Sequence, residues 1–342
     1  MKKSNLTERF MNKNRVKKIA TWIVVPLMAA IFLLDIATVV IGNSYCRRFT
    51  VTQEKFDYSD GDDRIHFLNT ANSDSILIES NGLYALIDAG EGNSNPRRKT
   101  AYKGYEQEVI DYVKKVCKKS DGSVYLDFIM GTHCHYDHIG SYLSLISDSE
   151  IGIGKAIFKE FNDKIAKNYE IERWEIDKVY QNIIDALNKR NVEVISDISD
   201  KEFLFGDFTL RFVNTVTSDE FEGKGENASS IGVVVSKGNK TAFLAADITA
   251  STGLEDTVAP LVGDVDLLKI GHHGYYGSSS KSFLESLSPE IAIVTNQLGK
   301  VYPNVKWNLT MSAKVPFYAT YDNNGIIATF ADDKIILTNN IH

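Results

Sequence analysis

The sequence predicts an α/β fold class for a domain that follows one N-terminal transmembrane helix. From residue 64 onward, short apolar β-prone runs alternate with segments of helical periodicity. Ahead of them, residues 19–42 form an apolar stretch of 24 residues with a single charged side chain, Asp35. With 43% hydrophobic and 24% charged residues, the whole chain has the composition of a globular protein.

Residues 1–18 form a basic tail with seven Lys and Arg and one Glu. The apolar stretch after it, residues 19–42, is long enough to cross a hydrocarbon core of about 30 Å. The positive tail predicts a cytoplasmic N-terminus, a single pass through a bacterial-type plasma membrane and an extracytoplasmic location for the domain that follows. A cleaved signal peptide is the alternative, but the length of the stretch and the lack of a small-residue cleavage site favour an uncleaved anchor.

The remainder divides into a linker and one large domain. Residues 43–63 are expected to be a polar linker, and residues 64–342 to fold together. Residues 155–191 are predicted to form a helical insert, whose aromatic-rich face either packs on the sheet or lines a substrate site. The three cysteines, Cys46, Cys117 and Cys134, form no paired framework, so structural disulfides are not expected.

Five of the seven histidines lie in two short clusters. The first, residues 133–138, directly follows an apolar run at 124–130 that predicts a buried strand, and a helix is expected to start after it. His133 and His135 alternate along an extended segment and are predicted to hold one metal ion, while Asp137 and His138 hold a second a few ångströms away. Such packing of polar groups is costly unless a bound metal organises it.

The first cluster resembles the His-x-His-x-Asp-His signature of the metallo-β-lactamase fold. Other segments resemble that family's landmarks in the same order: the opening hairpin and Asp-x-Gly turn at 72–78 and 84–90, the strand ending in Gly-Asp at 243–248, the last His motif at 267–274 and a C-terminal hairpin at 318–330. Ala246 stands where that strand usually has Gly. The resemblance covers residues 64–338 and implies a four-layer αββα sandwich.

The ending His-His-Gly, residues 272–274, resembles one subgroup of this family. That subgroup includes the hydrolase-like domain of ComEC-type DNA-uptake competence proteins and the phosphorylcholine esterases of bacterial cell walls. The resemblance implies two divalent metal ions, zinc with manganese as the alternative. It also implies a hydrolase in which metal-activated hydroxide attacks phosphorus or carbonyl carbon.

Carried over position by position, the resemblance places His133 and His135 on metal one, Asp137 and His138 on metal two, and Asp247 as a bridge between both. One histidine of the 272–273 pair completes metal two and the other faces the substrate. We take His273 as the ligand and His272, with Asp137 and Asp247, as catalytic. Asp88 is expected either beside the ligands or as a plain turn residue.

Three more residues are candidates for substrate contact. Asn227 stands where most family hydrolases have a metal-binding His, and an amide is a weak zinc ligand, so metal one is expected to keep an open position. The alternative for Asn227 is a loop amide that caps residues 229–231. Tyr275 and Tyr276 follow the second cluster, and their rings suit a quaternary ammonium group or a sugar. Packing in the core is the alternative for both.

The net charge of the chain limits which classes of ligand it is expected to bind. After residue 42 the chain has 31 Lys and Arg against 43 Asp and Glu, a net charge of −12. This argues against nucleic acid as the main ligand, because such binding depends on basic patches. The only compact basic run is Arg97-Arg98-Lys99. We therefore expect a membrane-anchored hydrolase of small-molecule or cell-envelope phosphoesters. A nuclease or DNA-uptake accessory, and a non-catalytic scaffold suggested by Asn227 and Ala246, are the alternatives.

Overall fold

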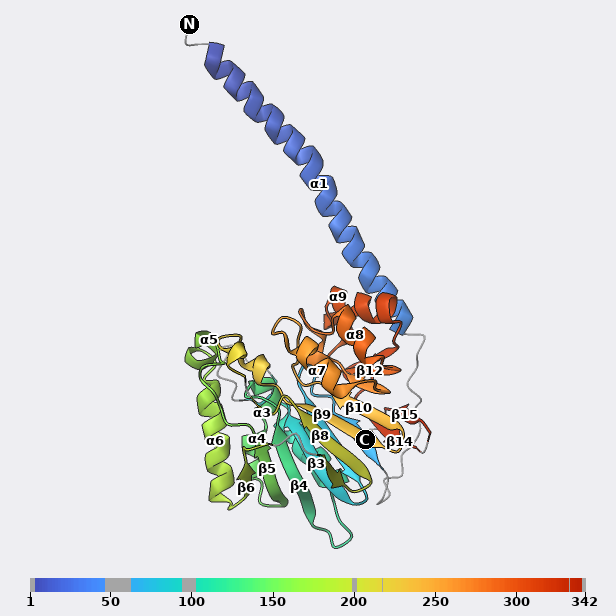
Figure 1. Ribbon diagram of the computed structural model, residues 1–342. Coiled ribbons are helices and arrows are strands. Elements are labelled where there is room, and N and C mark those ends of the chain that lie inside the picture. Colours follow the sequence, from blue (N-terminus) through green and yellow to red (C-terminus); the bar gives the residue numbers. More distant parts are fainter. Residues whose placement is uncertain are drawn as a thin grey trace.

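Two β-sheets pack face to face, and helices cover the outer face of each (Figure 1). The structure, a computed structural model, describes residues 4–46, 63–93, 103–198, 202–216, 218–331 and 333–339. The sheet order and the two helix layers confirm the predicted αββα sandwich.

The first sheet has eight strands in the order β15-β14-β1-β2-β3-β4-β5-β6. Its strands are β1 Arg64–Phe67, β2 Ser75–Ser80, β3 Leu83–Ala89, β4 Val124–Gly131, β5 Ile151–Phe158, β6 Glu193–Ile195, β14 Ile326–Phe330 and β15 Ile335–Thr338. Strands β3 to β6 run parallel, whereas β15, β14, β1, β2 and β3 pair antiparallel.

The second sheet has seven strands in the order β13-β12-β11-β10-β9-β8-β7. Its strands are β7 Phe203–Phe205, β8 Phe208–Val213, β9 Gly232–Lys237, β10 Lys240–Leu244, β11 Leu267–Lys269, β12 Ile291–Val294 and β13 Phe317–Ala319. Strands β10 to β13 run parallel. Both sheets therefore contain a parallel half, and ligand sites of α/β proteins form at the carboxyl ends of such strands.

Alternation of side chains along the strands divides the core into three layers. On β2, Ile76 and Ile78 face the second sheet, where they meet residues such as Val235 and Leu244 in the central layer. Leu77, between them, faces the helices instead. Because the strands are apolar on both sides, the sheets can be buried by helices outside and by each other inside.

Within the described part of the chain, four helices cover the first sheet and three cover the second. Those on the first sheet are α2 Glu106–Val116, α3 Tyr136–Ile139, α4 Tyr142–Ser147 and α6 Ile176–Lys189, with α5 Asn168–Glu172 beside α6. Those on the second are α7 Leu254–Val262, α8 Lys281–Leu287 and α9 Pro303–Trp307, which continues into the π-helical η5 Asn308–Ala313. Short 3₁₀ turns are η1 Asp219–Phe221, η2 Glu226–Ser229, η3 Gly271–Gly274 and η4 Leu298–Lys300.

The N-terminal helix α1, Ser4–Cys46, projects away from the domain (Figure 1). Its segment Thr21–Gly42 has a mean hydropathy of 2.6 and is long and apolar enough to cross a membrane. At 1.5 Å per residue these 22 residues span about 33 Å. Its last turns contact α9, so the apolar segment ends where the folded domain begins.

Two expectations for the chain's organisation are wrong in detail. Residues 155–158 of the expected helical insert belong to strand β5, and helix begins only at α5 and α6. A short apolar run of this kind fits a buried strand as well as a buried helix. The expected hairpin at 318–330 does not form, because β13 pairs in the second sheet and β14 in the first.

Other expectations fall partly outside the described residues. The expected linker at 43–63 begins as helix, since α1 continues to Cys46, and residues 47–62 are outside the described part. The basic run Arg97-Arg98-Lys99 also lies outside it. Cys117 and Cys134 are buried and free.

Candidate metal centre

The histidine clusters and their acidic partners meet at one edge of the sandwich, at the ends of strands from both sheets. Asp88 lies at the end of β3, His133 and His135 follow β4, Asp247 follows β10, and His272 and His273 follow β11 in η3. Asp137 and His138 lie on the short helix α3. Segments more than 100 residues apart in the sequence therefore contribute to one site, as expected where parallel strands end together.

One group of donors consists of His133, His135 and Asp247. The Nε2 atom of His133 lies 3.2 Å from Nδ1 of His135 and 3.7 Å from Oδ2 of Asp247. All three side chains are buried. Two imidazoles and one carboxylate within this reach form a donor set that suits a divalent transition metal.

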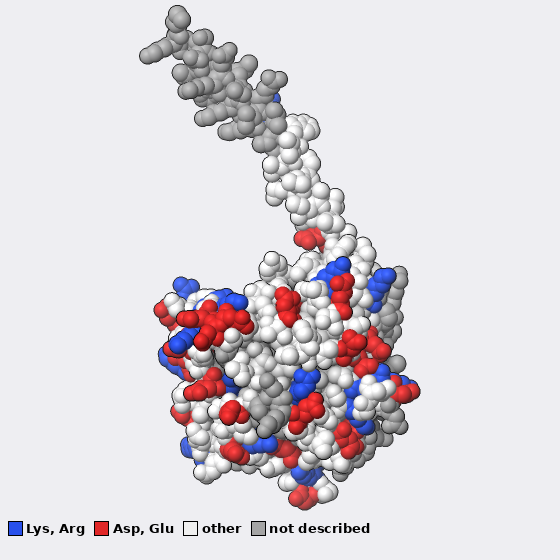
Figure 2. All heavy atoms as spheres, in the orientation of Figure 1, with Lys and Arg blue, Asp and Glu red and all other residues white. Residues whose placement is uncertain are grey.

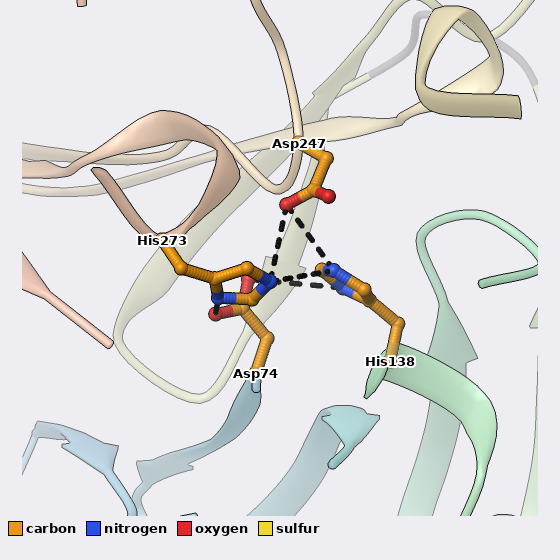
Figure 3. Close-up of side chains that lie close together, drawn as sticks. All are labelled: Asp74, His138, Asp247 and His273. Carbon is orange, nitrogen blue, oxygen red and sulfur yellow. Dashed lines mark hydrogen bonds and ion pairs between the residues drawn. The ribbon is translucent and has the colours of Figure 1, made fainter. Parts of the chain in front are cut away.

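A second group forms around the other oxygen of Asp247 (Figure 3). The Nε2 atoms of His138 and His273 lie 3.2 Å and 3.4 Å from Oδ1 of Asp247 and 3.2 Å from each other. Asp137 approaches the same place, with Oδ2 3.7 Å from Nε2 of His273. The two oxygens of Asp247 thus face different histidine groups, which is the arrangement of a carboxylate shared by two ion positions.

Each of the four buried histidines of the site has its other ring nitrogen against a fixed partner. Nδ1 of His138 lies 2.7 Å from Asp88, and Nε2 of His135 lies 3.1 Å from Glu170. Nδ1 of His133 lies 3.1 Å from the Thr132 hydroxyl. In metal sites such partners fix the tautomer and the orientation of the ligand ring.

The fourth histidine, His273, has the most elaborate support. Its Nδ1 lies 3.2 Å from Oδ1 of Asp74 and 3.1 Å from the hydroxyl of Thr295, which in turn donates to Asp74 at 2.5 Å. Lys269, fully buried, donates to the other oxygen of Asp74 and to the carbonyl of Ala246. These positive neighbours outweigh burial and hold the pKa of Asp74 below its usual value.

Asp74 lies close enough to count among the second group of donors, and Figure 3 shows it next to the His273 ring. Its oxygens, however, are already engaged by Lys269 and Thr295, and it meets the ring at Nδ1 rather than at Nε2. We therefore assign Asp74 to the positioning of His273, and Asp137 remains the carboxylate on the Nε2 side.

Asp247 provides the test of whether a cation fits. The side chain is 1% exposed, and neither oxygen has a hydrogen-bond partner of acceptable geometry among the described residues. Buried carboxylates normally have their acceptor capacity satisfied. An orphaned carboxylate surrounded by imidazole nitrogens whose far sides are already held fits divalent cations on both of its sides.

The pKa shifts of the site's histidines and of Asp247 also indicate a place for a cation. Burial lowers the pKa of His133 well below its usual value. Burial acts in the same direction on His138, but the carboxylates of Asp247 and Asp88 outweigh it and raise that pKa well above the usual value. Burial raises the pKa of Asp247, yet the charges of His138 and His273 outweigh it and leave the pKa well below its usual range. Positive charge is therefore favoured between these carboxylates.

His272 and His273 have different surroundings. His273 is fully buried and held by Asp74, whereas the side chain of His272 is 30% exposed. Nε2 of His272 lies 3.9 Å from Oδ2 of Asp247, and its Nδ1 has no hydrogen-bond partner among the described residues. His273 thus has the support expected of a ligand, while His272 stands on the open side of the Asp247 carboxylate.

Tyr275 and Tyr276, which follow the two histidines, also have different surroundings. The Tyr275 ring packs edge-on against His272 at 5.7 Å and is partly buried. Tyr276 is 69% exposed and packs on Tyr302, with ring centroids 6.0 Å apart. Tyr275 therefore adjoins the histidines, and Tyr276 lies farther out on the surface.

Asn227 lies in η2, a segment that is tied to the first histidine motif. The neighbouring Glu226 accepts a hydrogen bond from the amide of Cys134, and the amide of Ile231 donates to the carbonyl of Thr132. The side-chain oxygen of Asn227 is buried and has no hydrogen-bond partner among the described residues. The capping role considered for Asn227 is carried by its backbone carbonyl, which accepts from Ser230.

Four residues of the site have a strained backbone conformation. Asp88, Ala246, His272 and His273 have φ values of 57°, 44°, 50° and 50°, in the left-handed region that favours glycine. The value at Ala246 explains why Gly is usual at that position. Each such residue costs on the order of 1–3 kcal/mol and persists only where its surroundings hold it.

Three residues of the site were not found from the sequence. Asp74 and Lys269 are 195 positions apart and meet only in the fold, and Glu170 arrives from the insert on α5. The buried Lys269 at the end of an otherwise apolar strand, β11, is the one local signal, because an unpaired buried ammonium group is costly.

No known protein-family model matches the chain. A segment of 73 residues, 21% of this chain, is 30% identical to Recombination protein 2 of Haemophilus influenzae and spans 9% of that protein's length. Solved structures with a similar course of the chain include the metallo-beta-lactamase fold protein YhfI from Bacillus subtilis, with a TM-score of 0.44 at 12% identity over 77% of this chain and 98% of that one.

Two further structures are similar at the same level. A putative metal-dependent hydrolase from Parabacteroides distasonis has a TM-score of 0.44 at 11% identity over 80% of this chain and 99% of that one. Zn(2+)-bound PqqB from Methylobacterium extorquens has a TM-score of 0.42 at 10% identity, over 72% and 85%. The αββα sandwich and the histidine–aspartate site at its strand ends give this chain the metallo-β-lactamase fold with a candidate metal centre, as the sequence motifs predicted.

Proposed function

We propose that this protein is a metal-dependent hydrolase of phosphoesters, held at a membrane by α1. The observation that carries the proposal is Asp247, a buried carboxylate without hydrogen-bond partners among the described residues, whose two oxygens face two separate histidine groups. Paired ion positions that share one carboxylate suit the hydrolysis of phosphoryl compounds.

The residues that would hold the ions follow from the geometry. His133, His135 and Asp247 would hold one, and His138, His273, Asp137 and Asp247 the other. Imidazole-rich donor sets favour zinc, with manganese as the alternative because of the carboxylates. When bound, two such ions activate water and stabilise negative charge on the phosphoryl group.

The chain's own residues have distinct parts in this proposal. Asp247 fixes the spacing of the two donor groups, since each of its oxygens faces one of them. His272, on the open side of Asp247, would donate a hydrogen bond to a phosphoryl or leaving-group oxygen. Tyr275 packs against His272 and restricts where that ring can point. Asn227 would leave one side of the first group open to substrate.

The placement at the membrane rests on α1. The apolar segment Thr21–Gly42 is long enough to span a bilayer, and seven of the eight charged residues before residue 19 are Lys or Arg. By the positive-inside rule the N-terminus would be cytoplasmic and the catalytic domain extracytoplasmic, on the plasma membrane of a bacterial-type cell. The substrate would then be a small-molecule or cell-envelope phosphoester.

The test is turnover by the full-length protein in detergent, with a panel of phosphomonoesters and phosphodiesters and with metal content measured on the same sample. Turnover should fall by at least about a hundredfold in Asp247→Ala and in His135→Ala, because each removes a donor. Asp256→Asn, an exposed carboxylate on α7, is the control and should keep full activity. Unchanged turnover in both donor variants would rule the proposal out.

A nuclease or DNA-uptake accessory is the second candidate, favoured by the 73-residue match to Recombination protein 2. The net charge of −12 after residue 42 weighs against it, and on the face in Figure 2 Lys and Arg are interspersed with Asp and Glu. This candidate requires DNA binding that weakens steeply with salt. Absence of DNA binding at low salt would eliminate this candidate.

A non-catalytic scaffold is the remaining alternative. Such a protein would purify without metal and would still have the stability of a normal folded domain.

A further inference from the structure

The transmembrane helix and the candidate site are joined by one short helix, α9. Gly42, the last residue of the apolar segment, is buried against the side chain of Lys306, and a side chain at Gly42 would meet Lys306 carbon atoms at 3.3 Å. Lys306 lies near the C-terminal end of α9, one residue before Trp307. The level at which α1 would leave the hydrocarbon core is therefore the level of α9 (Figure 1).

The other end of α9 reaches the site. Tyr302, which precedes α9, has its ring 6.2 Å from Tyr275, and Tyr275 packs on His272. The amide of Tyr302 also donates to the carbonyl of Gly274, at the end of the histidine turn. Because Lys306 follows Tyr302 by only four residues, about 6 Å of helix separates the point where Gly42 packs from this chain of rings.

The outer face of α9 and η5 carries exposed apolar side chains in helical register. Trp307 is 42% exposed and Met311 is 45% exposed, four positions farther on. Lys314 is exposed one turn later. A helical segment with Trp and another apolar residue on one side and Lys at its end has the composition of a segment that lies in the interface of a bilayer.

The charges of this segment also favour contact with a lipid surface. Residues 302–315 contain no Asp or Glu, in a chain that has a net charge of −12 after residue 42. Of their two lysines, Lys314 is exposed and Lys306 is buried. An acidic domain next to anionic headgroups is repelled wherever its carboxylates approach them. A segment without carboxylates can approach the lipid surface without this repulsion.

We propose that the face formed by α9 and η5, with Trp307 and Met311 at its centre, rests on the lipid bilayer around α1. The occupant of this face is the membrane surface itself, because the face is continuous with the end of the transmembrane segment. Resting on the proposed function, this placement puts the open side of His272 near the headgroups. It selects phosphoesters carried by membrane lipids over those that diffuse in solution.

The docking is tested by depth measurement on the full-length protein in bilayer nanodiscs of phosphatidylcholine and phosphatidylglycerol. A Cys46→Ser background leaves the buried Cys117 and Cys134, so a fluorophore can be attached at Met311→Cys. Leu204→Cys is the control, since Leu204 is 79% exposed on β7, at the opposite edge of the second sheet from β13. Nitroxide lipids should quench the label at position 311 several-fold more than the label at position 204.

Equal quenching at the two positions would overturn the docking. So would shielding of the label at position 311 in lipid-free detergent together with the mass of a dimer, because a second copy would then cover the face. Neither measurement requires activity, so both decide the docking even if the proposed hydrolase function is wrong.

The substrate class is tested with a matched pair of phosphoesters, one on a diacyl lipid in the nanodisc and one soluble. Trp307→Asp and Met311→Asp should lower turnover of the lipid substrate at least about tenfold and leave the soluble one unchanged. Circular dichroism and metal content identify a variant that fails to fold, and the other variant then decides. An equal effect on both substrates overturns the lipid preference. Turnover of neither substrate by the unmodified protein overturns the hydrolase function, while quenching still reports on docking.

Discussion

Lys269 donates to Asp74 beneath the histidine site, and both side chains are at most 1% exposed. The pair joins the end of β11 to the residue that precedes β2, so it connects the two sheets. Asp74 passes this constraint to His273 through Nδ1. A buried ion pair placed directly behind a candidate ligand indicates that its carboxylate is kept charged in order to fix the ring.

We expect Asp74→Asn to weaken metal binding by about 10–100-fold, because an amide holds the His273 ring less firmly than a carboxylate does. Metal affinity is measured by competition with a chromophoric chelator. Asp127→Asn is the control, since Asp127 is a half-buried carboxylate on β4 that binds the amide of Tyr84 away from the site. The same affinity in both variants would mean that Asp74 has only a structural role.

Lys269→Met should destabilise the protein by about 3–5 kcal/mol, because it leaves the buried carboxylate of Asp74 without its cation. The double variant Asp74→Asn with Lys269→Met should recover part of this loss, since no uncompensated charge is then buried. Urea unfolding of the three variants measures the coupling. Additive losses would show that the pair is not energetically coupled.

Glu170, from the helical insert, contacts His135 as Asp74 contacts His273. We expect Glu170→Gln to lower metal affinity by about 10–100-fold through His135, while the fold is retained. Glu172→Gln on the same helix is exposed and serves as the control. If the two variants bind metal equally well, the insert packs beside the site without contributing to it.

The histidine motif and the strand before it could be predicted because both are local. His133 and His135 follow an apolar strand in the sequence, and the strand end fixes their direction in the fold. Asp74 could not be placed in the same way, because its partners Lys269, His273 and Thr295 come from the other sheet. The sequence predicted His273 rather than His272 as the ligand, but the physical reason came from the structure, because Asp74 reaches the His273 ring.

The insert shows a second limit of local patterns. Ala156 to Phe158 is apolar throughout, which is compatible with either a buried strand or a buried helix. It forms a strand because it pairs in parallel with β4 along its whole length. The composition of the later part, 168–189, correctly indicated helix but gave no sign that Glu170 turns inward to His135.

Removal of metal should lower the stability of the protein, because ions bound only to the folded state stabilise it. At a free metal concentration of 100 times Kd this contribution is about 2.7 kcal/mol per site. Thermal unfolding with and without a chelator measures it. Asp247→Ala should show little response to the chelator, because it removes a donor from both groups. A response equal to that of the unmodified protein would place the bound metal elsewhere.

His66 predicts a pH dependence that is separate from the site. It is fully buried on β1, 2.7 Å from the Tyr112 hydroxyl and 2.9 Å from Glu79, and burial lowers its pKa below the usual 6.5. In the unfolded chain the His66 ring therefore takes up a proton near pH 6.5, whereas in the folded protein it takes up the proton only at lower pH. The stability that this residue contributes is complete above pH 6.5 and falls as the pH drops, by up to about 1.4 kcal/mol per pH unit.

The measurement is the free energy of unfolding in urea between pH 7.5 and pH 5. This free energy should fall less steeply with decreasing pH in His66→Gln than in the unmodified protein, because Gln does not titrate. Identical slopes would mean that His66 takes up its proton equally in both states, with Glu79 compensating for burial.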